Sequence, residues 1–145
     1  MRRPSYDVIA YHDPSGSMKH DHMTVLVKEQ VSRDQLKELA QNLASLHRPD
    51  DIAFVDYQEF LASTPSLGEW RPEDDSGLRD KDWSRRPSQG EVALWEEHMR
   101  QEAPLQDIDE EGSIRSVAQR HGIIEKEVRD ALNKVRSWLG GGTAL

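Results

Sequence analysis

The sequence contains no cysteine, so it has no disulfide, no thiolate nucleophile and no cysteine-based zinc site. Long apolar runs are also missing and the mean hydropathy is -0.83, which argues against a membrane span. The N-terminal residues include no apolar signal region, and we therefore expect a cytoplasmic protein. With 35% hydrophobic and 32% charged residues, part of the chain is expected to stay outside a packed core.

The usual local signatures of enzymes are missing as well. The sequence has no Gly-x-Ser-x-Gly, no phosphate-binding Gly-rich loop and no His-Glu-x-x-His. Residues 15–17, beside His12 and Asp13, include the residue types of a catalytic triad, but a triad is defined by geometry. We expect a protein that is not an enzyme and that binds no cofactor.

Two groups of polar residues are candidate metal ligands. The first surrounds the first predicted hairpin and consists of His12, Asp13, His20, Asp21 and His22. Its spacing matches no zinc pattern, so a divalent site and plain solvated residues both stay open. The second, at residues 73–82, lacks the spacing of an EF-hand and is interpreted as a solvated loop. We expect no metal.

The N-terminal half has the pattern of a small α+β module. Residues 6–12 and 22–29 predict two strands that form a hairpin through the turn residues 13–17. Ser32 and Gln35 form a capping box, which begins a helix with a buried stripe of Leu36, Leu39, Ala40, Leu43 and Ala44. A third strand is expected over residues 51–57. The order β-β-α-β predicts a three-stranded sheet with one covering helix, and hence the α+β class.

The remaining chain divides into four further stretches. Residues 62–87 are predicted as a long loop of the 1–61 module, with Trp70 and Trp83 as anchors. Residues 88–139 form a helical part, which opens with a capping box of Ser88 and Glu91. Its first helix runs to about Glu102 with an inner face of Val92, Trp95 and Met99, and residues 101–112 form an acidic linker. Residues 140–145 are expected to be a flexible tail.

The last two predicted helices form a hairpin. The first begins after Ser113 as N-cap and presents Ile114, Val117, Ala118 and His121 on one face. Gly122 is expected to end it with a positive φ. The second has a buried stripe of Val128, Ala131, Leu132, Val135 and either Trp138 or Leu139. Trp138 is the tryptophan that we expect to be exposed, because it ends the last helix.

Two segments resemble known families. Ala118-x-x-x-Gly122-Ile123 followed by Val128 resembles the helix-turn-helix of bacterial regulators over about a sixth of the chain. Ile124 stands where that family commonly has a capping serine. Residues 6–83 resemble, loosely, a family of uncharacterised small bacterial domains, which implies a compact α+β module and no particular chemistry.

Charge is unevenly distributed along the sequence. Residues 113–136 contain six basic and three acidic residues, a balance of +3, whereas residues 91–111 contain eight carboxylates and one arginine, a balance of -7. Lys and Arg contacts to phosphate supply most non-specific DNA affinity, and the net charge of -8 argues against an indiscriminate DNA-binding protein.

Three interpretations follow from these patterns. The first is a small cytoplasmic regulatory protein whose hairpin contacts DNA and whose N-terminal module binds a partner or forms a homodimer. The residues expected to contact DNA are Arg120, Lys126, Arg129, Asn133 and Lys134. The second is a non-enzymatic interaction module of a mobile-element or defence system, whose acidic face binds a basic protein or mimics nucleic acid. The third is an enzyme without a recognisable local signature. For the hairpin alone, the alternative to DNA contact is a structural hairpin with solvated outer faces.

Overall fold

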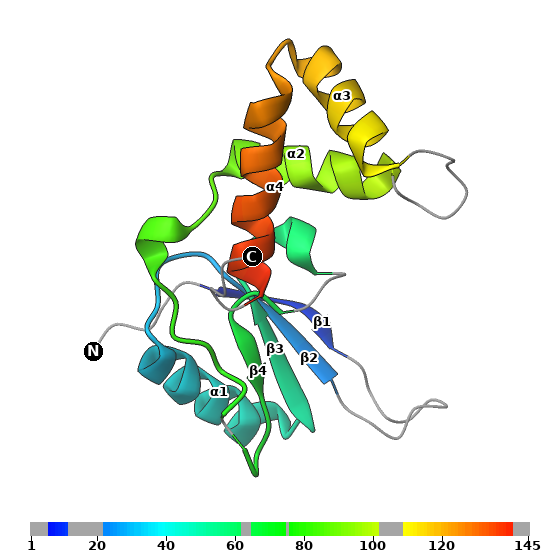
Figure 1. Cartoon of the computed structure of the whole chain (residues 1–145). Coiled ribbons are helices and arrows are strands. Elements are labelled where there is room, and N and C mark those ends of the chain that lie inside the picture. Colours follow the sequence, from blue (N-terminus) through cyan, green and yellow to red (C-terminus); the bar gives the residue numbers. More distant parts are fainter. Residues whose placement is uncertain (1–5, 12–21, 62–64, 75, 102–108, 141–145) are drawn as a thin grey trace. The chain divides into compact units, whose positions relative to one another are not determined.

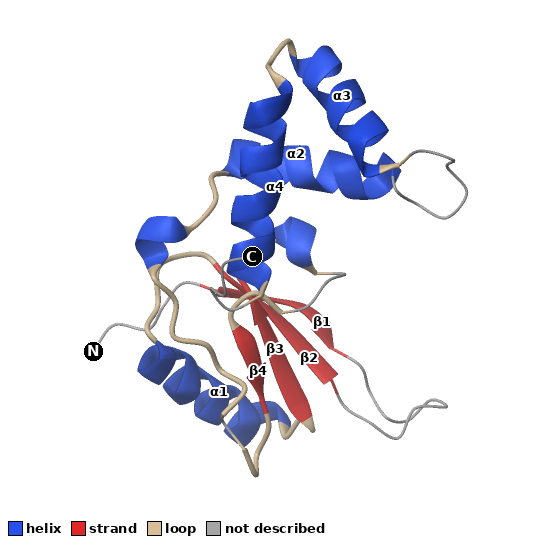
Figure 2. Cartoon of the chain, viewed as in Figure 1, coloured by secondary structure: helices blue, strands red, loops and turns tan. Residues whose placement is uncertain are grey.

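The structure, a computed structural model, describes residues 6–11, 22–61, 65–74, 76–101 and 109–140. The chain divides into two compact units, Met1–Trp83 and Ser84–Leu145, called here the sheet unit and the helical unit. Figure 2 shows strands in the sheet unit and only helices and loops in the helical unit. The predicted α+β class with a helical C-terminal part is confirmed. No helix in the described ranges is long and apolar enough to cross a membrane.

The sheet unit contains a mixed sheet of four strands in the order β1 (Tyr6–Tyr11), β2 (His22–Val27), β3 (Asp51–Val55) and β4 (Gly68–Trp70). β1 and β2 are antiparallel, as expected for a hairpin. β2 and β3 are parallel and are joined through helix α1 (Arg33–His47), because parallel neighbours need a long crossover. Figure 1 shows α1 alongside the sheet.

Helix α1 begins and ends where local chemistry predicts. The Ser32 hydroxyl accepts a hydrogen bond from the Gln35 amide at 3.1 Å, and Gln35 Oε1 accepts one from the Ser32 amide at 2.8 Å. This is the predicted capping box. The helix ends at His47, before Pro49, and its buried side chains are Leu36, Leu39, Ala40 and Leu43.

The prediction of a three-stranded sheet followed by a long loop over residues 62–87 misses one strand, because the sheet has four strands. The segment contains β4 and a short 3-10 helix, η2 (Trp83–Arg85), and η1 (Gln58–Phe60) precedes it. A three-residue strand is too short to show periodicity, and its pairing with β3 joins Ile52 to Trp70. The predicted anchoring by tryptophan is confirmed, since Trp70 is buried and the Trp83 indole donates to the Val31 carbonyl at 2.9 Å.

The helical unit consists of α2 (Gln89–Gln101), α3 (Glu110–His121) and α4 (Glu125–Leu139), which pack on one another. The Ser88 and Glu91 capping box of α2 is confirmed by bonds of 3.1 and 2.9 Å. Its inner face is Val92, Trp95 and His98, whereas Met99 is 46% exposed, so the expectation for Met99 is wrong. Helical periodicity allows burial of either His98 or Met99, which lie three and four positions after Trp95. His98 is the buried one, and it is hydrogen-bonded to Ser113.

Helix α3 begins earlier than predicted. Its N-cap is Asp109, whose carboxylate accepts a hydrogen bond from the Gly112 amide at 2.7 Å. Ser113, the predicted N-cap, is fully buried inside the helix. Glu110 and Glu111 therefore belong to the first turn, where negative charge is favoured, rather than to a linker. Most of the predicted linker (102–108) and of the predicted tail (141–145) lies outside the described residues.

Candidate functional site

The turn between α3 and α4 has the geometry that the sequence predicts. Gly122 ends α3 with φ 65°, and its amide lies within bonding distance of the Ala118 and Gln119 carbonyls. The Ile123 amide donates to the Ala118 carbonyl at 3.1 Å. The N-cap of α4 is Ile124, which offers no capping side chain and is 61% exposed. Only residues 122–124 separate the two helices.

The predicted apolar stripes of α3 and α4 are buried, but the predictions for His121 and Trp138 are wrong. Ile114, Val117 and Ala118 are buried in α3, but the His121 side chain is 43% exposed. In α4 the buried stripe is Val128, Ala131, Leu132, Val135 and Trp138. The expected exposure of Trp138 is therefore wrong, because the stripe continues at i+3 from Val135 into the last turn.

The five candidate DNA-contacting residues occupy different sides of the helical unit. Lys126, Arg129 and Asn133 share one face of α4, because their spacing of three and four residues is one helical turn. Arg120 lies near the end of α3, and Lys134 lies on another flank of α4. The structure thus brings three of the five together on a single helical face.

Each candidate cation forms an ion pair with a carboxylate. Within α4, Lys126 pairs with Asp130 at 2.7 Å. The other pairs join helices: Arg120 with Glu97 at 2.8 Å, Lys134 with Glu91 at 3.2 Å, and Arg129 Nη1 with Glu111 Oε1 at 2.8 Å. A second Arg129 nitrogen bonds the other Glu111 oxygen, so this pair is bidentate.

The acidic block and the basic segment of the sequence are therefore partners in the fold. Glu110 pairs with Arg136 at 2.7 Å. The carboxylates that pair with cations of residues 113–136 therefore include Glu91, Glu97, Glu110 and Glu111. Residues 84–145 hold nine basic and eleven acidic residues, a formal charge of -2. Among the described residues, this pairing removes much of the separation between acidic and basic charge that the sequence suggests.

The pKa shifts of Glu111, Arg129 and Lys126 favour the charged forms of these three side chains. Hydrogen bonds from Arg129 hold the pKa of Glu111 below its usual range, and those bonds also raise the pKa of Arg129. The hydrogen bond to Asp130 raises the pKa of Lys126. A phosphate that approaches α4 therefore meets the Glu111 carboxylate beside Arg129 and the Asp130 carboxylate beside Lys126.

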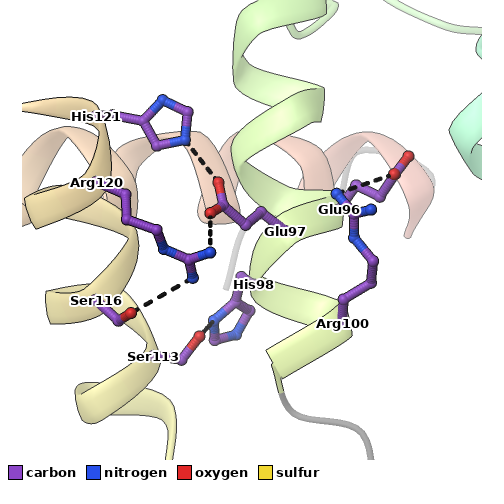
Figure 3. Close-up of polar contacts among 8 residues, drawn as sticks. All are labelled: Glu96, Glu97, His98, Arg100, Ser113, Ser116, Arg120 and His121. Carbon is purple, nitrogen blue, oxygen red and sulfur yellow. Dashed lines mark hydrogen bonds and ion pairs between the residues drawn. The ribbon is translucent and has the colours of Figure 1, made fainter.

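Glu97 joins the end of α3 to α2 (Figure 3). One carboxylate oxygen accepts from Arg120, and the other lies 2.6 Å from His121 Nε2. The Arg120 guanidinium also donates to the Ser116 hydroxyl at 3.4 Å. Both basic residues lie in the last turn of α3, where positive charge is favoured. The cluster therefore ties Arg120 and His121 to a carboxylate of α2.

A buried polar contact also joins the three helices. His98 and Ser113 are both 0% exposed, and His98 Nδ1 lies 2.7 Å from the Ser113 hydroxyl (Figure 3). Arg136 Nη2 lies 3.4 Å from His98 Nε2. Because an arginine only donates, Nε2 is the acceptor and Nδ1 carries the proton that is donated to Ser113. No local motif predicts this contact, since the two residues are 15 positions apart.

A second polar cluster lies in the sheet unit. His22 Nδ1 bonds Asp51, its register partner on β3, and the Thr24 hydroxyl lies 3.2 Å from His22 Nε2. The groups follow the order of a hydroxyl, imidazole and carboxylate triad, but Thr24 is only 8% exposed and its hydroxyl is not presented to a substrate. We assign the cluster to holding β2 and β3 in register.

In the described part of the chain, no group of three or more side chains could hold a metal ion. His12, Asp13, His20 and Asp21 lie outside the described residues, and His22 is bonded to Asp51. Comparisons of the chain with protein-family models, with curated proteins and with solved structures found no match.

Proposed function

We propose that this is a small regulatory protein whose helical unit binds duplex DNA, with α4 as the helix that enters the major groove. The observation that supports this most directly is the tight α3–α4 pair, in which Gly122 adopts the left-handed conformation and Ala118 and Ala131 are buried. Buried small residues allow two helix backbones to approach closely. A short turn of this kind presents the outer face of the second helix to a partner.

The outer face of α4 has the side chains that base recognition needs. Arg129 can donate two hydrogen bonds to a guanine, and Asn133 can bond an adenine through its amide. Lys126, whose side chain is 76% exposed, supplies a phosphate contact at the start of the helix. Arg120 and Lys134 then contact phosphates on either side.

The carboxylate partners limit this binding without preventing it. Exposed ion pairs contribute only about 0–1 kcal/mol each, so a phosphate can replace a carboxylate as the partner of a cation. The carboxylates remain near the duplex after the exchange and oppose it. Non-specific affinity is therefore low, and a duplex is retained when base contacts compensate.

The same ion pairs support a second candidate, a non-enzymatic protein-interaction module. In this alternative the pairs between helices are structural, and the helical unit binds a protein rather than a duplex. Loss of the DNA hypothesis in the following experiment leaves this alternative as the better account.

Duplex binding by the full chain tests the proposal. Roughly three to five phosphate contacts predict a log-log salt slope of about -3 to -5. Replacing Lys126 and Arg129 by alanine should reduce the magnitude of that slope by up to about two, while the buried stripe of α4 keeps the fold intact. Arg71→Ala is the matched control, because Arg71 is an exposed, ion-paired cation of the sheet unit.

Selection from randomised duplexes tests base recognition separately. The parent protein should enrich a motif, and Asn133→Ala should relax one position of it. A motif with two symmetric half-sites would further indicate that the protein binds as a dimer. No retained duplex at low salt, together with no enriched motif, would contradict the proposal.

A further inference from the structure

We propose that a groove in the helical unit binds a basic, amphipathic segment of a partner protein. The groove has a volume of about 570 Å³ and is formed by α2, α4 and the turn between α3 and α4. Its size lies within the roughly 300–1,000 Å³ range of known ligand sites. This inference goes beyond the DNA proposal, since the groove lies on a different flank of α4 from Arg129 and Asn133. Lys126 and Lys134 border it as the ion-pair partners of Asp130 and Glu91.

The floor of the groove is apolar. Ala93 and Leu94 contribute from α2, Ile123 from the turn and Ala131 from α4. Ala93 is exposed, and Leu94 and Ile123 are only partly buried, so they offer apolar surface to a partner. Ile123 lies in the turn between α3 and α4 and is only partly buried, so part of its side chain is available to a partner. An apolar side chain of a partner can therefore be anchored here.

The rim of the groove is acidic. It includes Glu91, Glu127 and Asp130, and the only basic side chain among the lining residues is His121, which is bonded to Glu97. Burial raises the pKa of Glu91, but its hydrogen bonds with Ser88 and Lys134 outweigh that effect and hold the pKa below its usual range. Glu91 is therefore negatively charged at neutral pH.

Glu127 is the rim carboxylate that is most available to a partner. Glu91 pairs with Lys134 and Asp130 pairs with Lys126. No hydrogen bond or ion pair of the Glu127 side chain occurs within the described ranges, and the residue is exposed. Among the described residues, no cation is therefore paired with the Glu127 carboxylate.

An apolar floor beside uncompensated negative charge matches one class of partner. A helix or extended segment with an apolar anchor between Lys or Arg residues buries the anchor and pairs its cations with the rim. A nucleic acid does not fit, because its phosphates would meet the same carboxylates. The groove therefore favours a basic protein segment.

Amide chemical shifts of the full-length, isotope-labelled protein test this inference. The probe is a 14-residue amphipathic peptide of Lys and Leu, and its matched partner has Glu at every Lys position. We expect the basic peptide to shift the amides of Leu94, Ile123 and Ala131, and the acidic peptide to leave them unchanged. Glu127→Lys should weaken binding of the basic peptide by about tenfold.

Glu125→Lys is the matched control, because it makes the same charge change on the same helix outside the groove. We expect less than a twofold effect from it. Equal weakening by the two variants would reduce the binding to general electrostatic attraction and overturn the inference, as would shifts confined to other residues or no shifts at all. Failure of the DNA proposal is recognised separately, by the loss of duplex retention with peptide binding intact.

Discussion

Several polar side chains of this protein are held in place by partners that are distant in the sequence. Glu97 holds Arg120 and His121 from another helix, and His98 is kept buried by its bonds to Ser113 and Arg136. These residues are polar, and in the fold they form contacts between helices. Their replacement therefore affects stability rather than only solubility.

The stability of the protein should rise between about pH 8 and pH 10.5 because of Lys81. Burial lowers the pKa of Lys81 to about 8, an effect that Arg79 reinforces and Asp56 opposes. The unfolded chain, with a lysine pKa of about 10.4, binds more protons in this window, so deprotonation favours the folded state. Lys81→Met should remove the rise and stabilise the protein at pH 7 by about 1 kcal/mol, since part of the side chain stays in water.

Urea unfolding at pH 7, 8.5 and 10, followed by tryptophan fluorescence, measures this effect. Lys37→Met is the control, because Lys37 lies on the exposed side of α1. Equal pH dependence in the parent and the Lys81→Met variant would contradict the prediction.

Removal of the Ser113 hydroxyl should destabilise the helical unit by about 1–3 kcal/mol. Ser113→Ala takes away the acceptor of the His98 Nδ1 proton at a site that water does not reach. Ser116→Ala, which removes only an exposed 3.4 Å contact with Arg120, should cost less than about 0.5 kcal/mol. Chemical denaturation compares the two variants, and equal effects would show that the buried bond adds no stability.

At the scale of elements, capping motifs within one helical turn correctly predicted where helices α1 and α2 begin. The capping boxes of α1 and α2 each join residues three positions apart. The start of α3 was predicted wrongly because Asp109 and Ser113 are both good N-cap residues, and only burial of Ser113 distinguishes them. β4 was missed because its pairing with β3 is not local.

Two glycines with positive φ should differ in their tolerance of alanine. Gly68, with φ 106°, would place a Cβ 2.3 Å from the Gly77 carbonyl oxygen, whereas Gly122, with φ 65°, has nothing within 4 Å of that position. Gly122→Ala therefore costs only backbone strain, about 1–2 kcal/mol. Gly68→Ala adds a clash with backbone and should cost more, about 3 kcal/mol.

Hydrogen exchange of the β3 amides measures the effect of Gly68→Ala. Hydrogen exchange of the α4 amides measures the effect of Gly122→Ala. Gly122→Asn is a further control, because asparagine tolerates the left-handed region and should cost less than alanine. A larger effect of Gly122→Ala than of Gly68→Ala would contradict the prediction.

At the scale of the whole molecule, the negative charge is unevenly divided. The sheet unit holds ten basic and sixteen acidic residues, a formal charge of -6, and the helical unit has a formal charge of -2. The basic segment at residues 113–136 is thus set within an acidic protein and is paired with acidic neighbours in its own unit. Under the DNA proposal, we therefore expect the non-specific attraction to a duplex to be weak.

The amino-acid sequence alone determined the features that depend on neighbours a few residues apart. These are the α+β class, the capping boxes, the buried stripes of α1 and α4, and the left-handed Gly122. Their causes are short-range: backbone geometry, capping bonds and helical periodicity each act within a turn or two.

Only the tertiary structure decided which charges remain available to a partner. The sequence separates an acidic block from a basic segment, yet Arg129 pairs with Glu111 across 18 positions and Arg136 with Glu110 across 26. Ion pairing requires oppositely charged atoms within a few ångström, and helix packing sets those distances. The groove beside Glu127 arises in the same way, from three segments whose proximity the order of residues does not encode locally.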